Sequence, residues 1–263
     1  MKNRTSIFLS IIFLFQISCL SAQCIEGNCI QGEGKIIYKN NDTYQGYFKD
    51  GFRHGQGTLV QFTKTDQITS KGLFIYDKII QGNKLIKNLK HGFESLVTVT
   101  YKTYLGKITN QTNLYSGPSD QFDILLILNS DSNVLILSDK EINNFYNVID
   151  IDSNTEGYLY ISNVELIEEK KPEKNNVFEI IGNTTDILTS EITIYNSHHT
   201  ACTIKLGTES FNFDPKETKT ITVKPGNYRI FLSSKGTIPY VGEIELLRGK
   251  KYYRERYVKT IYN

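Results

Sequence analysis

Hydrophobic residues along this chain come in short runs that are separated by Asn, Asp, Gly, Ser and Lys. In the C-terminal third, apolar and polar positions alternate, as in 191–195 (EITIY) and 218–223 (TKTITV), which is typical of half-buried strands. The runs at 124–128 and 134–137 are continuously apolar but only as long as a strand. Helical periodicity of useful length is absent, and β-branched and aromatic residues dominate. The pattern predicts an all-β protein.

The first 22 residues have the pattern of a signal peptide. Two basic residues precede an apolar run over 7–15, and small residues come after it. This run is too short to span a bilayer, so we expect export with cleavage after Ala22. A lipoprotein anchored through Cys19 or Cys24 is the less favoured alternative, because the residues before both cysteines depart from a lipobox. The predicted localisation is secreted, or periplasmic and associated with the outer membrane.

The stretch 44–57 (YQGYFKDGFRHGQG) places glycines at tight offsets between large aromatic residues. Such glycines mark backbone that takes positive φ or lies against another segment, and the aromatic rings are spaced to stack. The spacing resembles a MORN repeat unit, whose motif residues here are Tyr44, Gly46, Phe48, Gly51, Gly55 and Gly57. The resemblance implies β-hairpins that stack into an elongated sheet without catalytic activity.

Related spacing recurs around this unit. The Gly-x-Gly of 32–34 returns at 55–57, a period of 23 residues, with Asn28 in the place of a left-handed glycine. A decayed unit is visible at 72–74, so we expect a MORN module over 24–92. The favoured interpretation is that these repeats extend the sheet and present the C-terminal remainder of the chain. The alternative is a face that binds acidic lipid head groups, as proposed for some MORN proteins.

Basic residues lie in the expected turn of the hairpin. Lys49, Arg53 and His54 are predicted to be exposed beside glycine-rich backbone, an arrangement that could hold a phosphate. Asp50 cancels much of this charge, so a solvated turn is the favoured interpretation.

Cysteine usage fits an exported protein. Cys24 and Cys29 are close in sequence, and a disulfide between them is expected to pin the first edge strand. The closed loop is short, so its entropic stabilisation is small. The alternatives are free thiols or half of a metal site, but a second cysteine pair for zinc is absent. We expect Cys202 to be a buried core thiol.

From residue 107 the pattern changes. The stretch 112–119 (TNLYSGPS) resembles the opening of a bacterial SH3 (SH3b) domain, and the segments FYNV at 145–148 and GYLY at 157–160 extend the resemblance over 107–167. The resemblance implies a small barrel that binds peptidoglycan peptides on an aromatic surface.

The aromatic surface departs from the family pattern, because Tyr115 replaces an arginine and Phe or Tyr replaces both tryptophans. The candidate ligand groove consists of Tyr115, Tyr146, Tyr158 and Tyr160. Tyr158 and Tyr160 are two strand positions apart and share a face. Alternation in a small barrel makes a buried core face an equal alternative.

The last third comes after a charged linker at 168–176 (EEKKPEKNN). Short alternating strands with turn residues between them predict a β-sandwich over 177–263. The expected strands are 191–195, 203–206, 218–223, 228–232 and 242–246. The passage through Pro225 and Gly226 resembles PEGA-like and carboxypeptidase-regulatory-like sandwiches.

Catalytic chemistry finds little support in the sequence. Gly-x-Ser-x-Gly, His-Glu-x-x-His and P-loop motifs are absent. His198 and His199 near Cys202 are predicted to lie in a solvated loop, since neighbouring histidines on a strand point to opposite faces. Asp150 and Asp152 are expected on one strand face, as a pair without a catalytic role. We therefore predict no enzyme activity, no cofactor, no metal and no small-molecule substrate.

Charge excludes one further class of partner. The formal net charge of +2 gives no long-range field for nucleic acid. These observations predict an exported, non-enzymatic modular scaffold of the bacterial cell envelope that binds protein or peptidoglycan peptide. The alternative is a membrane-surface adaptor that binds acidic lipid through the MORN face.

Overall fold

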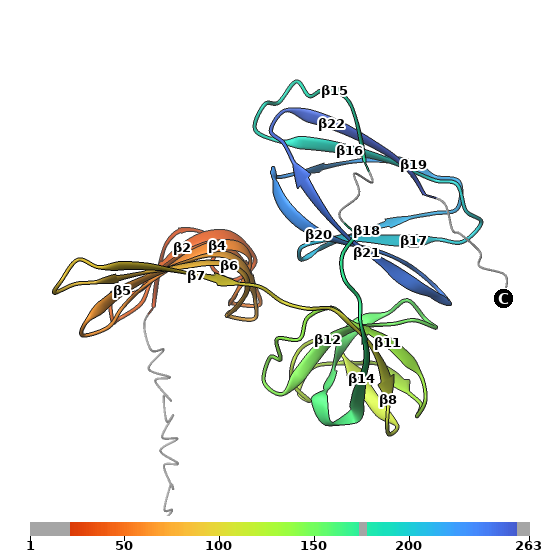
Figure 1. The fold of residues 1–263 in the computed structure, drawn as a ribbon, viewed down its shortest axis with the longest axis horizontal. Helices are drawn as coiled ribbons and strands as arrows, with labels where there is room; N and C mark the ends of the chain where they lie inside the picture. Colours follow the sequence, from red (N-terminus) through yellow and green to blue (C-terminus); the bar gives the residue numbers. More distant parts are fainter. Residues whose placement is uncertain (1–21, 174–177, 257–263) are drawn as a thin grey trace, which may run out of the picture.

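The computed structural model describes residues 22–173 and 178–256, and these form four β-sheets (Figure 1). No α-helix occurs among them, and the one helical turn is the 3-10 helix Ile161–Asn163. The all-β prediction is confirmed. A helix long and apolar enough to cross a membrane is also absent from the described residues. The predicted signal peptide over 1–22 lies outside these residues except for Ala22.

The N-terminal sheet is an antiparallel meander of seven strands, each paired with the next along the chain. The strands are β1 (Gln23–Gly27), β2 (Gly32–Ile37), β3 (Thr43–Lys49), β4 (Phe52–Phe62), β5 (Asp66–Ile75), β6 (Lys78–Asn88) and β7 (Glu94–Val99). In Figure 1 it is the red-to-yellow sheet, and its last strand leads to the middle part of the chain.

One row of glycines crosses this sheet. The residues paired along it from strand to strand are Gly27, Gly34, Gly46, Gly57, Gly72 and Gly82. Tyr44 lies over the row, and its hydroxyl donates to the carbonyl oxygens of Tyr47 and His54 at 3.1 and 3.2 Å. A Cβ at Gly57 would lie 2.2 Å from that hydroxyl oxygen. The ring therefore requires glycine beneath it.

The aromatic residues of the same motif form the core of this sheet. Tyr44, Phe48 and Phe74 are fully buried, and the ring of Tyr44 meets the other two edge-on at 5.1 and 5.3 Å. Gly51 and Gly55 have φ values of 79° and 62°, which are strained for other residues. The structure thus gives a reason for the identity of each motif residue within 44–57.

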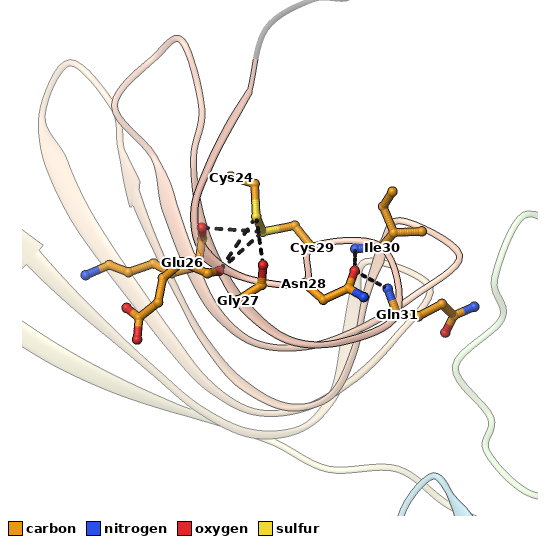
Figure 2. Close-up of a disulfide and its surroundings, with 8 residues drawn as sticks. Cys24, Glu26, Gly27, Asn28, Cys29, Ile30 and Gln31 are labelled. Atoms are coloured by element: carbon orange, nitrogen blue, oxygen red, sulfur yellow. Dashed lines mark hydrogen bonds between the residues drawn. A yellow bond between two sulfur atoms is a disulfide. The ribbon is translucent and has the colours of Figure 1, made fainter.

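The predicted disulfide is present between Cys24 and Cys29, whose Cα atoms are 6.0 Å apart (Figure 2). It closes the turn from β1 to β2 at the first edge of the sheet. The expectation for Asn28 was wrong, because the left-handed residue is Gly27 at φ 69°. The side-chain oxygen of Asn28 instead accepts hydrogen bonds from the next turn amides, at Ile30 and Gln31.

The middle sheet has seven strands in the order β10-β9-β13-β12-β11-β8-β14 and is strongly curled (Figure 1). Its strands are β8 (Tyr104–Ile108), β9 (Thr112–Tyr115), β10 (Ile124–Leu128), β11 (Asn133–Ile136), β12 (Phe145–Asp150), β13 (Glu156–Tyr160) and β14 (Val164–Glu169). Every strand contributes a buried residue to one shared inner core.

The central strands of this sheet are buried on both faces. Val134 and Ile136 belong to the inner core, whereas the alternate residues Leu135 and Leu137 belong to a second core on the outer face. Successive side chains on a strand point to opposite faces, so a strand buried on both faces has a continuous apolar run. This explains the unbroken VLIL sequence.

Asp150 and Asp152 were expected on the same face of one strand, but only Asp150 belongs to a strand. Strand β12 ends at Asp150, which is buried and accepts a hydrogen bond from the backbone N–H of Ser153 at 2.8 Å. Asp152 lies in the turn after the strand and is exposed. The aspartate-rich sequence serves the turn, because an aspartate side chain readily accepts from backbone N–H groups just after it.

The charged linker is paired at both of its described ends. Glu168 and Glu169 complete β14, and the Lys170 N–H donates to the carbonyl of Thr103 at 2.8 Å. The Glu173 N–H donates to the carbonyl of Val241 in the C-terminal part at 3.0 Å. The described part of the predicted linker thus forms backbone hydrogen bonds with both the middle and the C-terminal parts of the chain.

The C-terminal part consists of two four-stranded sheets, β15-β22-β16-β19 and β18-β17-β20-β21. The strands are β15 (Glu179–Asn183), β16 (Ser190–Asn196), β17 (Cys202–Leu206), β18 (Glu209–Phe213), β19 (Thr218–Val223), β20 (Gly226–Ser234), β21 (Thr237–Leu246) and β22 (Lys250–Arg256). Both sheets contribute to one core, in which Cys202 is buried as expected. Strands β15, β18 and β22 had not been predicted.

The contact between Tyr44 and the glycine row generates a first prediction. Gly57→Ala places a methyl group inside the Tyr44 ring, and we expect a loss of about 1–3 kcal/mol in the free energy of unfolding from overpacking. Urea unfolding measures it. Gly182→Ala is the matched control, because nothing lies within 4 Å of a Cβ there. Equal stability of the two variants would contradict the role given to the ring.

Candidate binding site at the module junction

The three parts of the fold, here called modules, meet in one hydrophobic core, the junction core. The N-terminal sheet contributes Leu73, Ile75, Tyr76 and Ile80; the middle sheet and its flanks contribute Tyr101, Tyr115, Leu135, Leu137, Ile142, Phe145, Ile149 and Tyr158; and the C-terminal module contributes Phe231 and Val241. Both neighbours therefore cover the outer face of the middle sheet at its central strands.

Tyr76 is the main contact of the N-terminal sheet with the junction core. Its ring meets the rings of Tyr158 and Phe122 edge-on, with centroids 5.7 and 6.0 Å apart. Tyr76 and Asp77 form the two-residue turn between β5 and β6, with φ values of 41° and 68°. A bulky residue in this region is strained, by about 1–3 kcal/mol, and burial of the ring in the junction core offsets that cost.

The four tyrosines of the predicted groove do not form one open surface. Tyr115 and Tyr158 are buried in the junction core, and burial raises the pKa of Tyr158 well above its usual value. Tyr160 shares that face and stacks on Phe145 with centroids 4.1 Å apart. Tyr146 packs beside the inner core instead. For Tyr115 and Tyr158, the alternative of a buried core face is therefore the correct one.

Polar contacts also join the modules. Lys205 of β17 forms an ion pair with Glu156 of β13, with Nζ 2.9 Å from Oε1. Arg229 of β20 donates to the carbonyl of Tyr101 at 2.9 Å, and its guanidinium lies 4.1 Å from the centre of that ring. Arg229 also pairs with Glu243 at 3.1 Å. Both cations are largely buried, so each needs the partner it has.

His54 lies at the same junction and is buried, so the prediction of an exposed turn residue was wrong. Its ring meets Tyr76 edge-on, with centroids 5.5 Å apart. Burial lowers its pKa to about 3, and the ammonium groups of Lys49 and Lys205 act in the same direction. The imidazole is therefore neutral at ordinary pH. Its Nδ1 is buried without a hydrogen-bond partner among the described residues.

The other two basic residues of this segment, Arg53 and Lys49, contact neighbouring side chains. Arg53 forms an ion pair with Asp77 at 2.8 Å, and Lys49 lies over the ring of Tyr76, with Nζ 5.8 Å from its centre. Burial raises the pKa of Tyr76 to about 12. Arg53 and Lys49 thus support the turn that carries Tyr76.

Two hollows flank His54. The larger, about 480 Å³, is a cleft between the N-terminal sheet and the C-terminal module. It is lined by Glu33, Tyr47, Lys49, His54, Gly55, Gln56, Leu73, Leu206, Gly207, Thr208, Glu209, Lys224 and Tyr228. The smaller, about 250 Å³, lies where all three modules meet and shares Lys49, His54 and Thr208 with the cleft. No sequence pattern marks either hollow, because each is built from distant segments.

The remaining candidate ligands do not assemble into a metal site. His198 is half-buried and His199 exposed in the loop after β16, with their ring centroids 4.7 Å apart. Cys202 is buried in the sandwich core. Across residues 22–173 and 178–256, no three His, Cys, Asp or Glu side chains lie together as a metal site would require.

Comparison of the chain with protein-family models, curated proteins and solved structures gave no match. The resemblances to MORN repeats and to SH3b domains are therefore still predictions.

His54 should make stability depend on pH. Its folded-state pKa of about 3 is below the ordinary 6.5, so the unfolded chain binds the proton more readily. The stability from the neutral ring is complete above pH 6.5 and is lost, at about 1.4 kcal/mol per pH unit, as pH falls towards 3. We expect His54→Phe to flatten this slope in urea unfolding between about pH 6.5 and pH 4.5.

His91→Phe is the control, because His91 lies on an exposed turn and the substitution leaves the junction unchanged. Carboxyl groups titrate alike in all three proteins, so the difference between slopes reports His54. A His54→Phe slope equal to that of wild type would contradict the burial of this ring.

Tyr76→Asn tests the junction core directly. Asparagine tolerates positive φ, so the turn is kept while the ring contacts are lost. We expect the N-terminal sheet to separate from the middle sheet, because a buried aromatic side chain contributes about 3–5 kcal/mol. Small-angle scattering should show a larger radius of gyration, and proteases should cut 100–103 faster. Phe93→Ala removes an exposed ring from the same sheet and should change neither measurement.

Proposed function

We propose that this protein is an exported, non-enzymatic scaffold of the bacterial cell envelope that binds protein or cell-wall peptide. The observation that carries the proposal is the junction core, to which all three modules contribute buried residues. A shared core holds the modules as one rigid body, which suits a protein that presents binding surfaces at fixed positions. The disulfide and the lack of a membrane-spanning helix in the described residues are compatible with an extracellular or periplasmic location.

The last strand of the N-terminal sheet supports binding to another protein. Strand β7 ends the sheet, and its adjacent residues Leu96 and Val97, which point to opposite faces, are 66% and 46% exposed. Such an edge can accept a strand from a partner. At the other edge, the disulfide fixes β1. Within the described residues neither edge strand pairs with a further strand, and a disulfide holds only β1.

The resemblance to SH3b domains supports a peptide ligand, but its site must differ from the predicted groove. Tyr115 and Tyr158 are covered by the junction core, so an extended ligand has no access to them in this arrangement. The cleft beside His54 is large enough for a ligand, since such pockets measure about 300–1,000 Å³.

Co-sedimentation with purified peptidoglycan, run beside flotation with anionic liposomes, tests the proposal. We expect the chain without its predicted signal peptide to sediment with peptidoglycan and to stay with the soluble fraction in flotation. Flotation that weakens as salt rises would favour the alternative function, an adaptor that binds acidic lipid through the N-terminal sheet. Failure to sediment with peptidoglycan would remove the cell-wall part of the proposal.

A further inference from the structure

The charges that line the cleft between the N-terminal sheet and the C-terminal module are only partly paired. Glu33 of β2 forms an ion pair with Lys224, which closes one side of the cleft. Lys49 and Glu209 line the same cleft, and within the described residues neither is within ion-pair distance of an opposite charge. The cleft thus offers one cation and one carboxylate that are unpaired.

The rest of the lining has no net charge. His54 is neutral, because burial holds its pKa low, and the pair of Glu33 and Lys224 cancels. Partial desolvation raises the pKa of Glu209, as expected for a carboxylate that lacks a cationic partner. A ligand with a single charge would satisfy one of the two unpaired groups and be repelled by the other. A ligand that carries both charges would satisfy both.

The apolar and polar parts of the cleft fit a peptide body between the two charges. Leu73 and Leu206 supply buried apolar surface, and Tyr47 and Tyr228 supply aromatic surface. Gln56 and Thr208 supply hydrogen-bonding groups. A few convergent polar groups in a partly apolar hollow are typical of ligand sites.

Two glycines keep this hollow open. Gly55 has φ 62°, and Gly207, in the turn between β17 and β18, has φ 61°. A Cβ at Gly55 would lie 3.1 Å from Cβ of Tyr47 and 3.5 Å from Oγ1 of Thr208. Gly55 in β4 therefore lies close to the side chain of Thr208 in the β17–β18 turn, and a side chain at position 55 would occupy that space. Gly55, which the repeat pattern requires, also shapes the wall of the cleft.

From these observations we infer that the cleft binds a short peptide with a free ammonium and a free carboxylate group, the carboxylate against Lys49 and the ammonium against Glu209. The inference rests on the proposed function and names its site and ligand class. Two sources carry this chemistry, namely the stem peptides of peptidoglycan and small peptides of ordinary L-amino acids.

Isothermal titration calorimetry with the whole chain lacking its predicted signal peptide tests the inference. The probes are the free tripeptide Ala-Leu-Ala, the same peptide with its amino end acetylated, its carboxyl end amidated, or both, and a free stem peptide. We expect the doubly blocked peptide to bind at least tenfold more weakly than the free one. The tighter of the stem peptide and Ala-Leu-Ala identifies the source of the ligand.

Variants assign each charge to its partner. Lys49→Met should weaken binding of the free peptide about tenfold and make binding insensitive to amidation, because the partner of the carboxylate is gone. Glu209→Gln should likewise make binding insensitive to acetylation. Lys90→Met and Glu165→Gln remove exposed charges outside the cleft and should bind like wild type.

Equal binding of free and doubly blocked peptides, or wild-type affinity in both Lys49→Met and Glu209→Gln, would overturn the inference. So would sedimentation with peptidoglycan by a chain that binds none of the peptides, although the proposed function would then stand. A chain that binds Ala-Leu-Ala through these two residues but ignores peptidoglycan would support the cleft and refute the cell-wall function.

Discussion

Burial of both faces of the central strands of the middle sheet is the constraint on which the rest of the structure depends. Its inner face closes on itself, but its outer face carries Leu135, Phe145, Ile149 and Tyr158, which water would otherwise contact. Leaving these apolar side chains in water would be unfavourable, so this part of the outer face needs a cover. The N-terminal sheet and the C-terminal module cover it, and this coverage fixes where the modules meet and hence where the cleft forms.

The N-terminal sheet can cover that face because one residue accepts strain. Most two-residue hairpin turns with positive φ use Asn, Asp or Gly, and Tyr76 does not fit that rule. Its ring reaches Tyr158 and Phe122, so energy from packing holds a backbone conformation that the turn alone would disfavour. The usual turn preference is thus overridden at Tyr76 by a long-range packing contact.

The local parts of this fold could be predicted from the sequence, because local patterns determine them. Alternation identified β16 and β19, the spacing of Cys24 and Cys29 identified the disulfide, and glycine offsets identified the hairpin at Tyr44. The exposure of side chains could not be predicted in the same way. His54 was expected to be exposed, and for Tyr158 a groove and the core were equal alternatives, yet each is buried by a module that is distant in sequence. Strand periodicity says which face a residue is on, but not what covers that face.

The glycines of the repeat pattern have two different roles. Gly46 and Gly57 lie under the ring of Tyr44, and this contact within the sheet is enough to explain both glycines. Gly55 serves the hairpin as well, but it also faces Thr208 of the C-terminal module, a contact that no repeat pattern contains. The motif that builds the N-terminal sheet thus also forms part of one wall of the cleft, at Gly55. The charge and polarity of that wall come from the neighbouring residues Lys49 and His54.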